Sequence, residues 1–142
     1  MHLWDSNILR HYATGHATLD AHLQRVSLTD IALPSIVVAE VLCGRCEYAL
    51  KAELAQLPLA HALLLETWRT LEKFQVIVFD EQMAASMAQL QKQHRSPKRY
   101  PDMMIAAMAL VSKHVVVTRN QQHFADLLPP QQLQNWIDDP PH

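Results

Sequence analysis

The opening stretch, Met1–Ile8, constrains the fold of this chain more than any other feature. A short apolar run ends in Asp5, and two small polar residues, Ser6 and Asn7, follow it. This pattern is typical of a central parallel strand that stops at Asp5 and turns into a helix capped by Ser6 or Asn7. In open parallel α/β sheets, ligands bind just outside the carboxyl ends of the strands. An acid at that position is placed to hold a metal ion.

The rest of the chain alternates short apolar runs with helical patterns. Strands separated by helices favour an α/β fold with a parallel sheet, right-handed crossovers and helices on both faces. We expect strands ending near residue 5 and over 30–33, 75–79, 115–118 and 133–137, and helices over 6–12, 18–27, 35–46, 48–56, 59–73, 81–94 and 102–113. The buried stripe of helix 59–73 is predicted to comprise Leu63, Leu64, Trp68 and Leu71.

The length of 142 residues is that of one domain, which we place over residues 1–137, with a frayed tail at 138–142. The net charge of −2 gives no overall positive field for nucleic-acid binding. No stretch has the length and apolar character of a membrane span or a signal peptide. We therefore expect a cytoplasmic protein that makes no membrane contact.

The two cysteines, Cys43 and Cys46, form a C-x-x-C pattern inside a helical segment. A structural zinc site would need a second pair, which the sequence lacks. A redox site is typical of the start of a helix beside a thioredoxin-like unit. We therefore interpret the two cysteines as small side chains on a helix. A redox function of the C-x-x-C pattern remains a rival interpretation.

Three acids from three different elements are candidate metal ligands. Asp5 follows the first strand, and taken alone it is explained by helix capping. Glu40 lies in a run where few residues are polar, which predicts a carboxylate at the rim of the core that needs a cation. Asp102 lies in the first turn of a helix that is apolar on nearly all sides, so it should face a cleft. Oxygen ligands of this kind suit Mg²⁺ or Mn²⁺.

Such an ion would favour phosphodiester hydrolysis by an activated water. No serine or cysteine stands beside an evident base, so a metal-activated water is the simpler mechanism. Asn120 and His123 follow the strand at 115–118, and each is individually typical of a turn or a surface position. Nearby, a basic cluster supports a phosphate-gripping loop and a solvated helix end equally well; it consists of Lys92, His94, Arg95, Lys98 and Arg99.

Four motifs in order resemble those of the PIN-domain family. They span residues 3–124 and are more specific together than any one alone. The length and compact layout are most similar to the VapC-type toxins of bacterial toxin–antitoxin pairs. The motifs are an apolar strand followed by D-[TS]-N at Leu3–Leu9, an acid followed by apolar-x-G at Pro34–Gly44, D-x-x-I-A-A within Tyr100–Ala107, and a strand ending in T-x-N at Val116–Asn120 that closes on Phe124.

This resemblance implies a PIN-like three-layer α/β/α fold with a central parallel sheet of four or five strands. It implies a Mg²⁺-dependent ribonuclease in which Asp5, Glu40 and Asp102 gather the metal, with Mn²⁺ as the alternative ion. The family often has a fourth acid at the position of Asn120 or of His123, which this sequence lacks. Asn120 is then a polar support, and the hydroxyl of Thr118 is a further one.

The resulting hypothesis is an endoribonuclease that hydrolyses RNA phosphodiester bonds as the toxin of a type II toxin–antitoxin pair. The resemblance also implies a homodimer and a cognate antitoxin, whose C-terminal segment lies in a groove of helices such as 59–73. The alternative is a catalytically weak or inactive PIN-like domain that binds protein or RNA. Its basis is the missing fourth acid.

Overall fold

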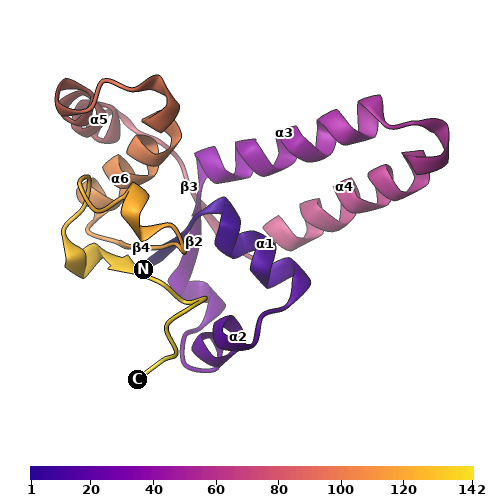
Figure 1. Cartoon of the computed structure of the whole chain (residues 1–142), viewed down its shortest axis with the longest axis horizontal. Coiled ribbons are helices and arrows are strands. Elements are labelled where there is room, and N and C mark those ends of the chain that lie inside the picture. Colours follow the sequence, from indigo (N-terminus) through magenta and orange to yellow (C-terminus); the bar gives the residue numbers. More distant parts are fainter.

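The computed structural model describes all 142 residues and contains a single five-stranded sheet. All of its pairings are parallel, and the strand order is β3-β2-β1-β4-β5. The predicted α/β fold with a parallel sheet is therefore confirmed (Figure 1). The strands are β1 His2–Trp4, β2 Ile31–Pro34, β3 Gln75–Ile77, β4 Val115–Val117 and β5 Leu133–Gln134.

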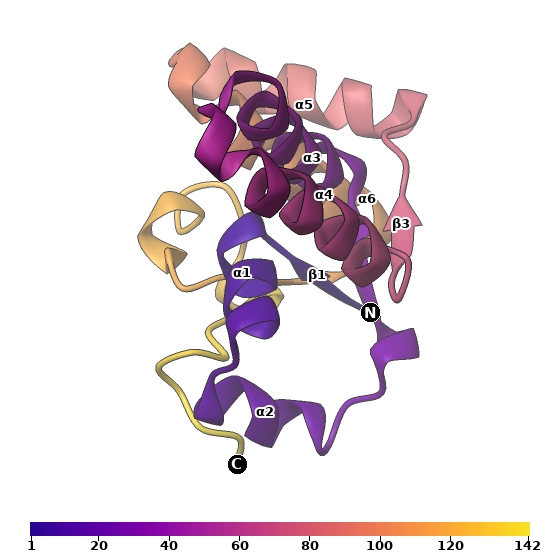
Figure 2. The same cartoon turned by 90° about the vertical axis from the view of Figure 1, so that its right-hand side faces the viewer.

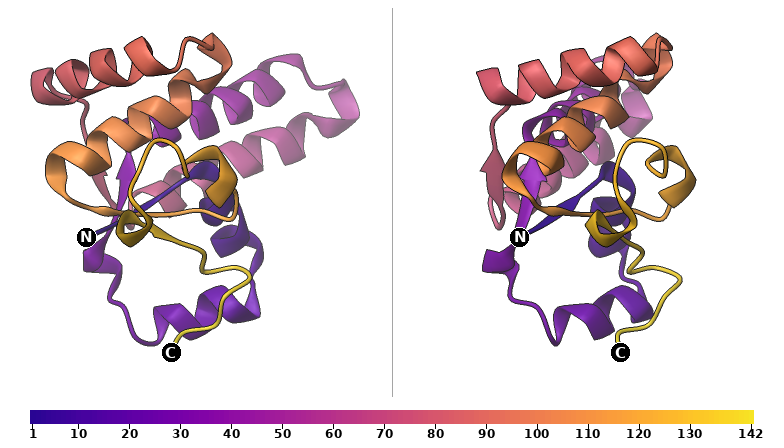
Figure 3. Two further views of the ribbon diagram at one scale, coloured as in Figure 1. Left: turned by 60° about the vertical axis from the view of Figure 1, so that its left-hand side comes forward. Right: turned by 90° about the vertical axis from the view of Figure 1, so that its left-hand side faces the viewer.

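Six α-helices flank the sheet. Helices α1 and α2 lie on one side of it, and α5 and α6 lie on the other (Figure 3). No helix combines the length and the hydropathy that crossing a bilayer requires. The helices are α1 Ser6–Thr14, α2 Ala17–Leu23, α3 Ser35–Lys51, α4 Leu57–Leu71, α5 Glu81–Gln93 and α6 Tyr100–Ser112, with short 3₁₀ turns at Leu28–Asp30, Leu54–Gln56, Pro97–Arg99, Gln121–His123 and Pro130–Gln132.

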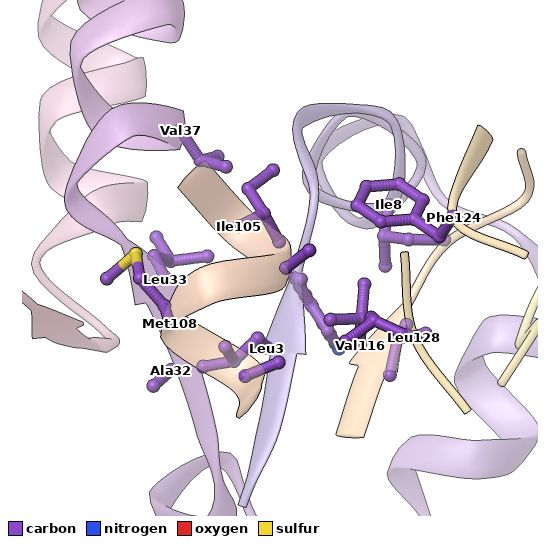
Figure 4. Close-up of a cluster of buried hydrophobic side chains, with 14 of the residues drawn as sticks. Leu3, Ile8, Ala32, Leu33, Val37, Ile105, Met108, Val116, Phe124 and Leu128 are labelled. Carbon is purple, nitrogen blue, oxygen red and sulfur yellow. The ribbon is translucent and has the colours of Figure 1, made fainter. Parts of the chain in front are cut away.

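The central position of β1 follows from its pairing on both sides. Leu3 lies opposite Ala32 of β2 and Val116 of β4, and all three are fully buried. Helix α6 packs as its apolar sequence predicts, with six buried residues between Met103 and Ala109. These elements share one core of 27 buried residues, part of which is drawn in Figure 4. The start of the chain is therefore anchored in the middle of the molecule.

The structure contradicts the expected division of residues 35–56 into two helices. Helix α3 runs without a break from Ser35 to Lys51, because no glycine or proline interrupts it after Gly44. It ends where Ala52 becomes extended, and residues 54–56 form only a 3₁₀ turn. Pro58 does not separate two helices but lies in the first turn of α4, where its missing N–H costs little.

Helices α3 and α4 form a hairpin that projects from the body of the molecule, which we call the arm (Figures 1 and 2). The prediction that Trp68 is buried is wrong: its residue surface is 54% exposed, and its indole Nε1 donates to Glu72 Oε1. Only Ala60 and Leu71 of α4 are buried, because most of α4 packs against α3 alone. The large exposed apolar residues of the arm are Leu50, Leu54, Leu59, Leu65 and Trp68.

Three further expectations need correction at element ends. Helix α2 stops at Leu23 instead of residue 27. Strand β3 ends at Ile77 and is an edge strand, which leaves Val78 72% exposed. Strand β5 ends at Gln134, because the Asn135 side-chain oxygen accepts bonds from the N–H groups of Ile137 and Asp138 and turns the chain.

We expect Met108→Ala to destabilise the protein strongly, because Met108 is fully buried in the core beneath the sheet. A truncation of this kind costs about 2–5 kcal/mol, which corresponds to a fall in Tm of roughly 6–15 °C for a domain of this size. Leu50→Ala removes an 84% exposed side chain and is the matched control. Equal shifts in thermal melting for the two variants would contradict this packing.

Candidate functional site

Asp5 lies directly after β1 and has two separate hydrogen-bonding duties. Its Oδ1 accepts the backbone N–H of Ile8 at 3.0 Å, so Asp5 itself is the N-cap of α1. Its Oδ2 accepts the hydroxyl of Thr118 at 2.6 Å. The expectation that Ser6 or Asn7 caps the helix is therefore wrong. Each carboxylate oxygen has its own protein partner, because a carboxylate offers about four acceptor sites.

Thr118 is the residue that fixes the orientation of Asp5. Strands β1 and β4 pair in register, with Trp4 opposite Val117, so the next residue of each strand lies beside the other. Thr118 is fully buried, and its oxygen also accepts the backbone N–H of Asn120 at 3.0 Å. Its hydroxyl thus donates to Asp5, a specific contact that the sequence did not reveal, since Thr118 was predicted only to be a polar support of the site.

Glu40 and Asp102 face Asp5 from two other helices. Glu40 lies in the second turn of α3 and Asp102 in the first turn of α6. Glu40 is exposed, but the neighbouring protein atoms remove part of its hydration and raise its pKa, and the negative charges of Asp102 and Asp5 raise it further. Burial likewise raises the pKa of Asp102, to which the charge of Asp5 adds. The structure therefore brings the three acids predicted from the sequence into one electrostatic cluster.

Burial also raises the pKa of Asp5 itself, although the hydrogen bonds from Thr118 and from the backbone of Ile8 oppose the shift. None of the three acids forms a salt bridge with a lysine or an arginine. The one basic side chain paired with them is His123, whose Nδ1 lies 3.8 Å from Asp102 Oδ2 and which carries a charge only when protonated. The cluster thus concentrates negative charge that the protein neutralises only weakly.

Carboxylate oxygens are the donors that Mg²⁺ and Mn²⁺ prefer, so the chemistry of this cluster fits a divalent cation. The geometry is open, since no three His, Cys, Asp or Glu side chains lie close enough together to ligate one ion. Mg²⁺ is commonly held by one or two carboxylates, with waters and substrate phosphates as its other ligands. An open acidic cluster is compatible with that kind of binding.

The two remaining residues singled out in the sequence lie at the margin of the cluster. Asn120 is exposed, and its backbone joins the cluster through Thr118. His123 is also exposed and adjoins it through Asp102. Both follow β4, so the carboxyl end of that strand contributes to the same edge of the sheet as Asp5.

A charged pair that the sequence did not reveal flanks the cluster. Arg99 of the basic cluster donates to both carboxylate oxygens of Asp126, at 2.8 and 2.6 Å. It also donates to the backbone oxygen of His123 at 3.1 Å. This pairing raises the pKa of Arg99 and lowers that of Asp126. Arg99 therefore holds the segment that carries His123 instead of standing free for a phosphate.

The fold and the site together define an α/β protein whose ligand site lies at the carboxyl edge of a parallel sheet. The family model described as PIN domain matches residues 3–127, and the chain belongs to this family. The resemblance seen in the four motifs is thereby confirmed. No curated protein matches the sequence.

Solved structures with the same fold include toxin–antitoxin proteins. FitAcB from Neisseria gonorrhoeae is 27% identical with a TM-score of 0.75, covering 98% of this chain and 100% of that chain. A toxin–antitoxin complex from Klebsiella pneumoniae is 21% identical with a TM-score of 0.70, covering 96% and 98%. DNA-bound VapBC from Salmonella typhimurium is 20% identical with a TM-score of 0.70, covering 95% and 97%.

Thr118→Val should destabilise the protein by about 1–3 kcal/mol, because it removes a buried donor to a carboxylate at constant side-chain volume. The pKa of Asp5 should rise further, since the bond from Thr118 favours the ionised form. Thr118→Ser retains the hydroxyl and is the control. Urea unfolding at pH 7 measures the stability of both variants, and an undiminished stability of Thr118→Val would mean that the hydroxyl adds nothing beyond packing.

Asp102→Asn should stabilise the metal-free protein more at pH 7 than at pH 4. Because the pKa of Asp102 is raised in the folded state, its contribution to stability is present at low pH and is lost as the pH rises through the folded pKa. The measurement is the difference in Tm between variant and wild type in EDTA at both pH values. A difference that does not grow from pH 4 to pH 7 would contradict the shift.

Asp126→Asn is the control of opposite sign. Its pKa is lowered by Arg99, so its contribution is present at neutral pH and is lost as the pH falls. The loss of Tm caused by Asp126→Asn should therefore be similar at pH 7 and pH 4, and it should shrink only as the pH falls below the ordinary pKa of 3.8.

Proposed function

We propose that this protein is a metal-dependent endoribonuclease that hydrolyses RNA phosphodiester bonds, and that it is the toxin of a type II toxin–antitoxin pair. The observation that carries the proposal is the cluster of Asp5, Glu40 and Asp102, three mutually repelling carboxylates without a lysine or arginine partner. Gathering such charges does not stabilise the fold, because each carboxylate raises the free energy needed to ionise the others. Perturbed acids in a cluster are typical of a functional site.

In this proposal Asp5, Glu40 and Asp102 hold the ion together, one or two of them directly and the rest through its bound waters, and Asn120 is a polar support at the end of β4. When bound, Mg²⁺ or Mn²⁺ activates water and neutralises the charge that grows on the phosphate. Asp5 is kept in one orientation by the hydroxyl of Thr118 and the N–H of Ile8. His123 lies against Asp102, where its protonated form would balance part of the negative charge.

The proposed partners are an antitoxin and a second copy of this chain, in the cytoplasm. The structural relatives named above include a toxin–antitoxin complex, which supports a partner of that kind. The arm exposes large apolar side chains such as Leu54 and Trp68, and patches of this kind mark protein interfaces. A surface of this type is expected of a chain that is held in a complex.

The second candidate is a catalytically weak or inactive PIN-like domain that binds protein or RNA. It is favoured by the open geometry of the cluster and by Asn120 and His123, which stand where the family often has a fourth acid. The two candidates differ in their affinity for divalent ions. Absence of Mg²⁺ or Mn²⁺ binding at millimolar concentration would favour the binding module.

Glu40→Gln should reduce Mg²⁺-dependent RNA cleavage by at least about 100-fold, because loss of even an indirect support of a metal site costs roughly 10–100-fold. Glu47→Gln is the matched control on the same helix, since Glu47 is exposed and pairs only with Lys51. Initial rates on a fluorescent RNA, with Mg²⁺ and with EDTA, measure the effect. Asp5→Asn should behave like Glu40→Gln, and wild-type activity in that variant after clean purification would refute the metal site.

A further inference from the structure

A groove of about 630 Å³ lies between α1, α3 and α4 and adjoins the acidic cluster. Glu40 lines it from α3, and Ser6, the residue after Asp5, lines it from α1. Its volume is within the usual range for small-molecule sites, which is roughly 300–1,000 Å³. The groove thus begins at the proposed catalytic acids and leads away from them along the arm.

The lining of the groove combines apolar walls with polar edges. Leu9, Val41 and Leu63 provide apolar surface, while Thr14, Thr67 and Thr70 carry hydroxyl groups. An unstacked nucleobase has the same combination, since its faces are apolar and its edge carries hydrogen-bond donors and acceptors. The lining holds no aromatic side chain, so a base would lie between these apolar walls and form hydrogen bonds through its edge.

Two arginines of the groove favour a polyanion over a peptide. Neither Arg10 nor Arg45 forms a salt bridge, although Glu66 also lines the groove. Arg45 is oriented by the bond from its Nε to Thr67 Oγ1 at 3.1 Å. Arg10 is exposed and lines the groove from α1, four residues after Ser6. Unpaired guanidinium groups beside such a path suit phosphates.

Gly44 keeps the groove open one helical turn after Glu40. Glycine within a helix costs roughly 0.5–1 kcal/mol relative to alanine, so its presence needs an explanation. Neither a positive φ nor a close contact requires it, because a Cβ atom at this position would meet nothing within 4 Å. Because Gly44 lines the groove and a Cβ there meets no neighbour, a larger side chain at residue 44 is expected to narrow the groove.

We propose that this groove receives one unstacked nucleobase of the RNA, next to the phosphodiester held at the acids, with Arg10 and Arg45 contacting the flanking phosphates. The inference rests on the proposed function and gives it a substrate-binding subsite. It also assigns a role to Gly44, which is to leave room for the base.

The test measures RNA binding in EDTA, so that it depends on neither metal nor cleavage. Fluorescence anisotropy follows a labelled 12-nucleotide RNA, and versions of it with one abasic position each, as protein is added. The proteins are wild type, Gly44→Ala and Gly44→Phe. We expect one abasic position to weaken binding to wild type and to Gly44→Ala by about tenfold, a typical value for one stacked base. Gly44→Phe should bind the intact RNA about tenfold more weakly and lose nothing further at that position.

Gly44→Ala controls for the backbone, and thermal melting establishes that Gly44→Phe is folded. The abasic scan of the wild type needs no variant, and a scan without any sensitive position would overturn the proposal. So would unchanged RNA affinity in Gly44→Phe together with weaker binding of its antitoxin, because the groove would then take a peptide. Base-dependent binding without any Mg²⁺-dependent cleavage would refute the nuclease function and leave this subsite standing.

Discussion

The hydrogen bond from Thr118 to Asp5 joins the two strands on which the rest of the site depends. It spans 113 residues of sequence and exists because β1 and β4 pair in parallel register. The other oxygen of Asp5 starts α1, so one carboxylate fixes a strand end, a helix start and a neighbouring strand. These hydrogen bonds hold the Asp5 carboxylate in one orientation. A fixed orientation of this kind is what a ligand-binding site requires.

The acidic cluster illustrates how a fold can accept a local cost. Burial raises the pKa of all three acids, and repulsion from the other acids adds to the shift of Glu40 and of Asp102. The hydrogen bonds to Asp5 and the charges of Arg10, Arg99 and His123 oppose these shifts only in part. The cost is carried by the large core beneath the sheet, in which Leu3, Met108 and Val116 are fully buried. Proteins often concentrate such unfavourable features at functional sites and compensate for them elsewhere.

Sequence reasoning predicted the parallel sheet well, because it depends on local patterns, whereas the role of Asp5, Glu40 and Asp102 as metal ligands stays a prediction. Apolar runs bounded by polar turns identify buried strands, and an acid after such a run lies at the edge where ligands bind. It failed where the answer depends on distant partners. The exposure of Trp68 follows from the projection of the arm, and the pairing of Arg99 with Asp126 joins residues far apart in sequence. The cap of α1 was also misjudged, because it was assigned to Ser6 or Asn7 once Asp5 was interpreted as a metal ligand, whereas Asp5 itself accepts the N–H of Ile8.

Helix α3 has a consequence that reaches beyond its own packing. It is one uninterrupted rod from Ser35 to Lys51, with Glu40 near its base and Leu50 near its tip. A straight helix transmits a tilt along its length, since its backbone hydrogen bonds resist bending between turns. Any molecule that grips the outer end of the arm therefore also acts as a lever on Glu40. A protein bound at the outer end of the arm could in this way change the position of Glu40 relative to Asp5 and Asp102 from several helical turns away.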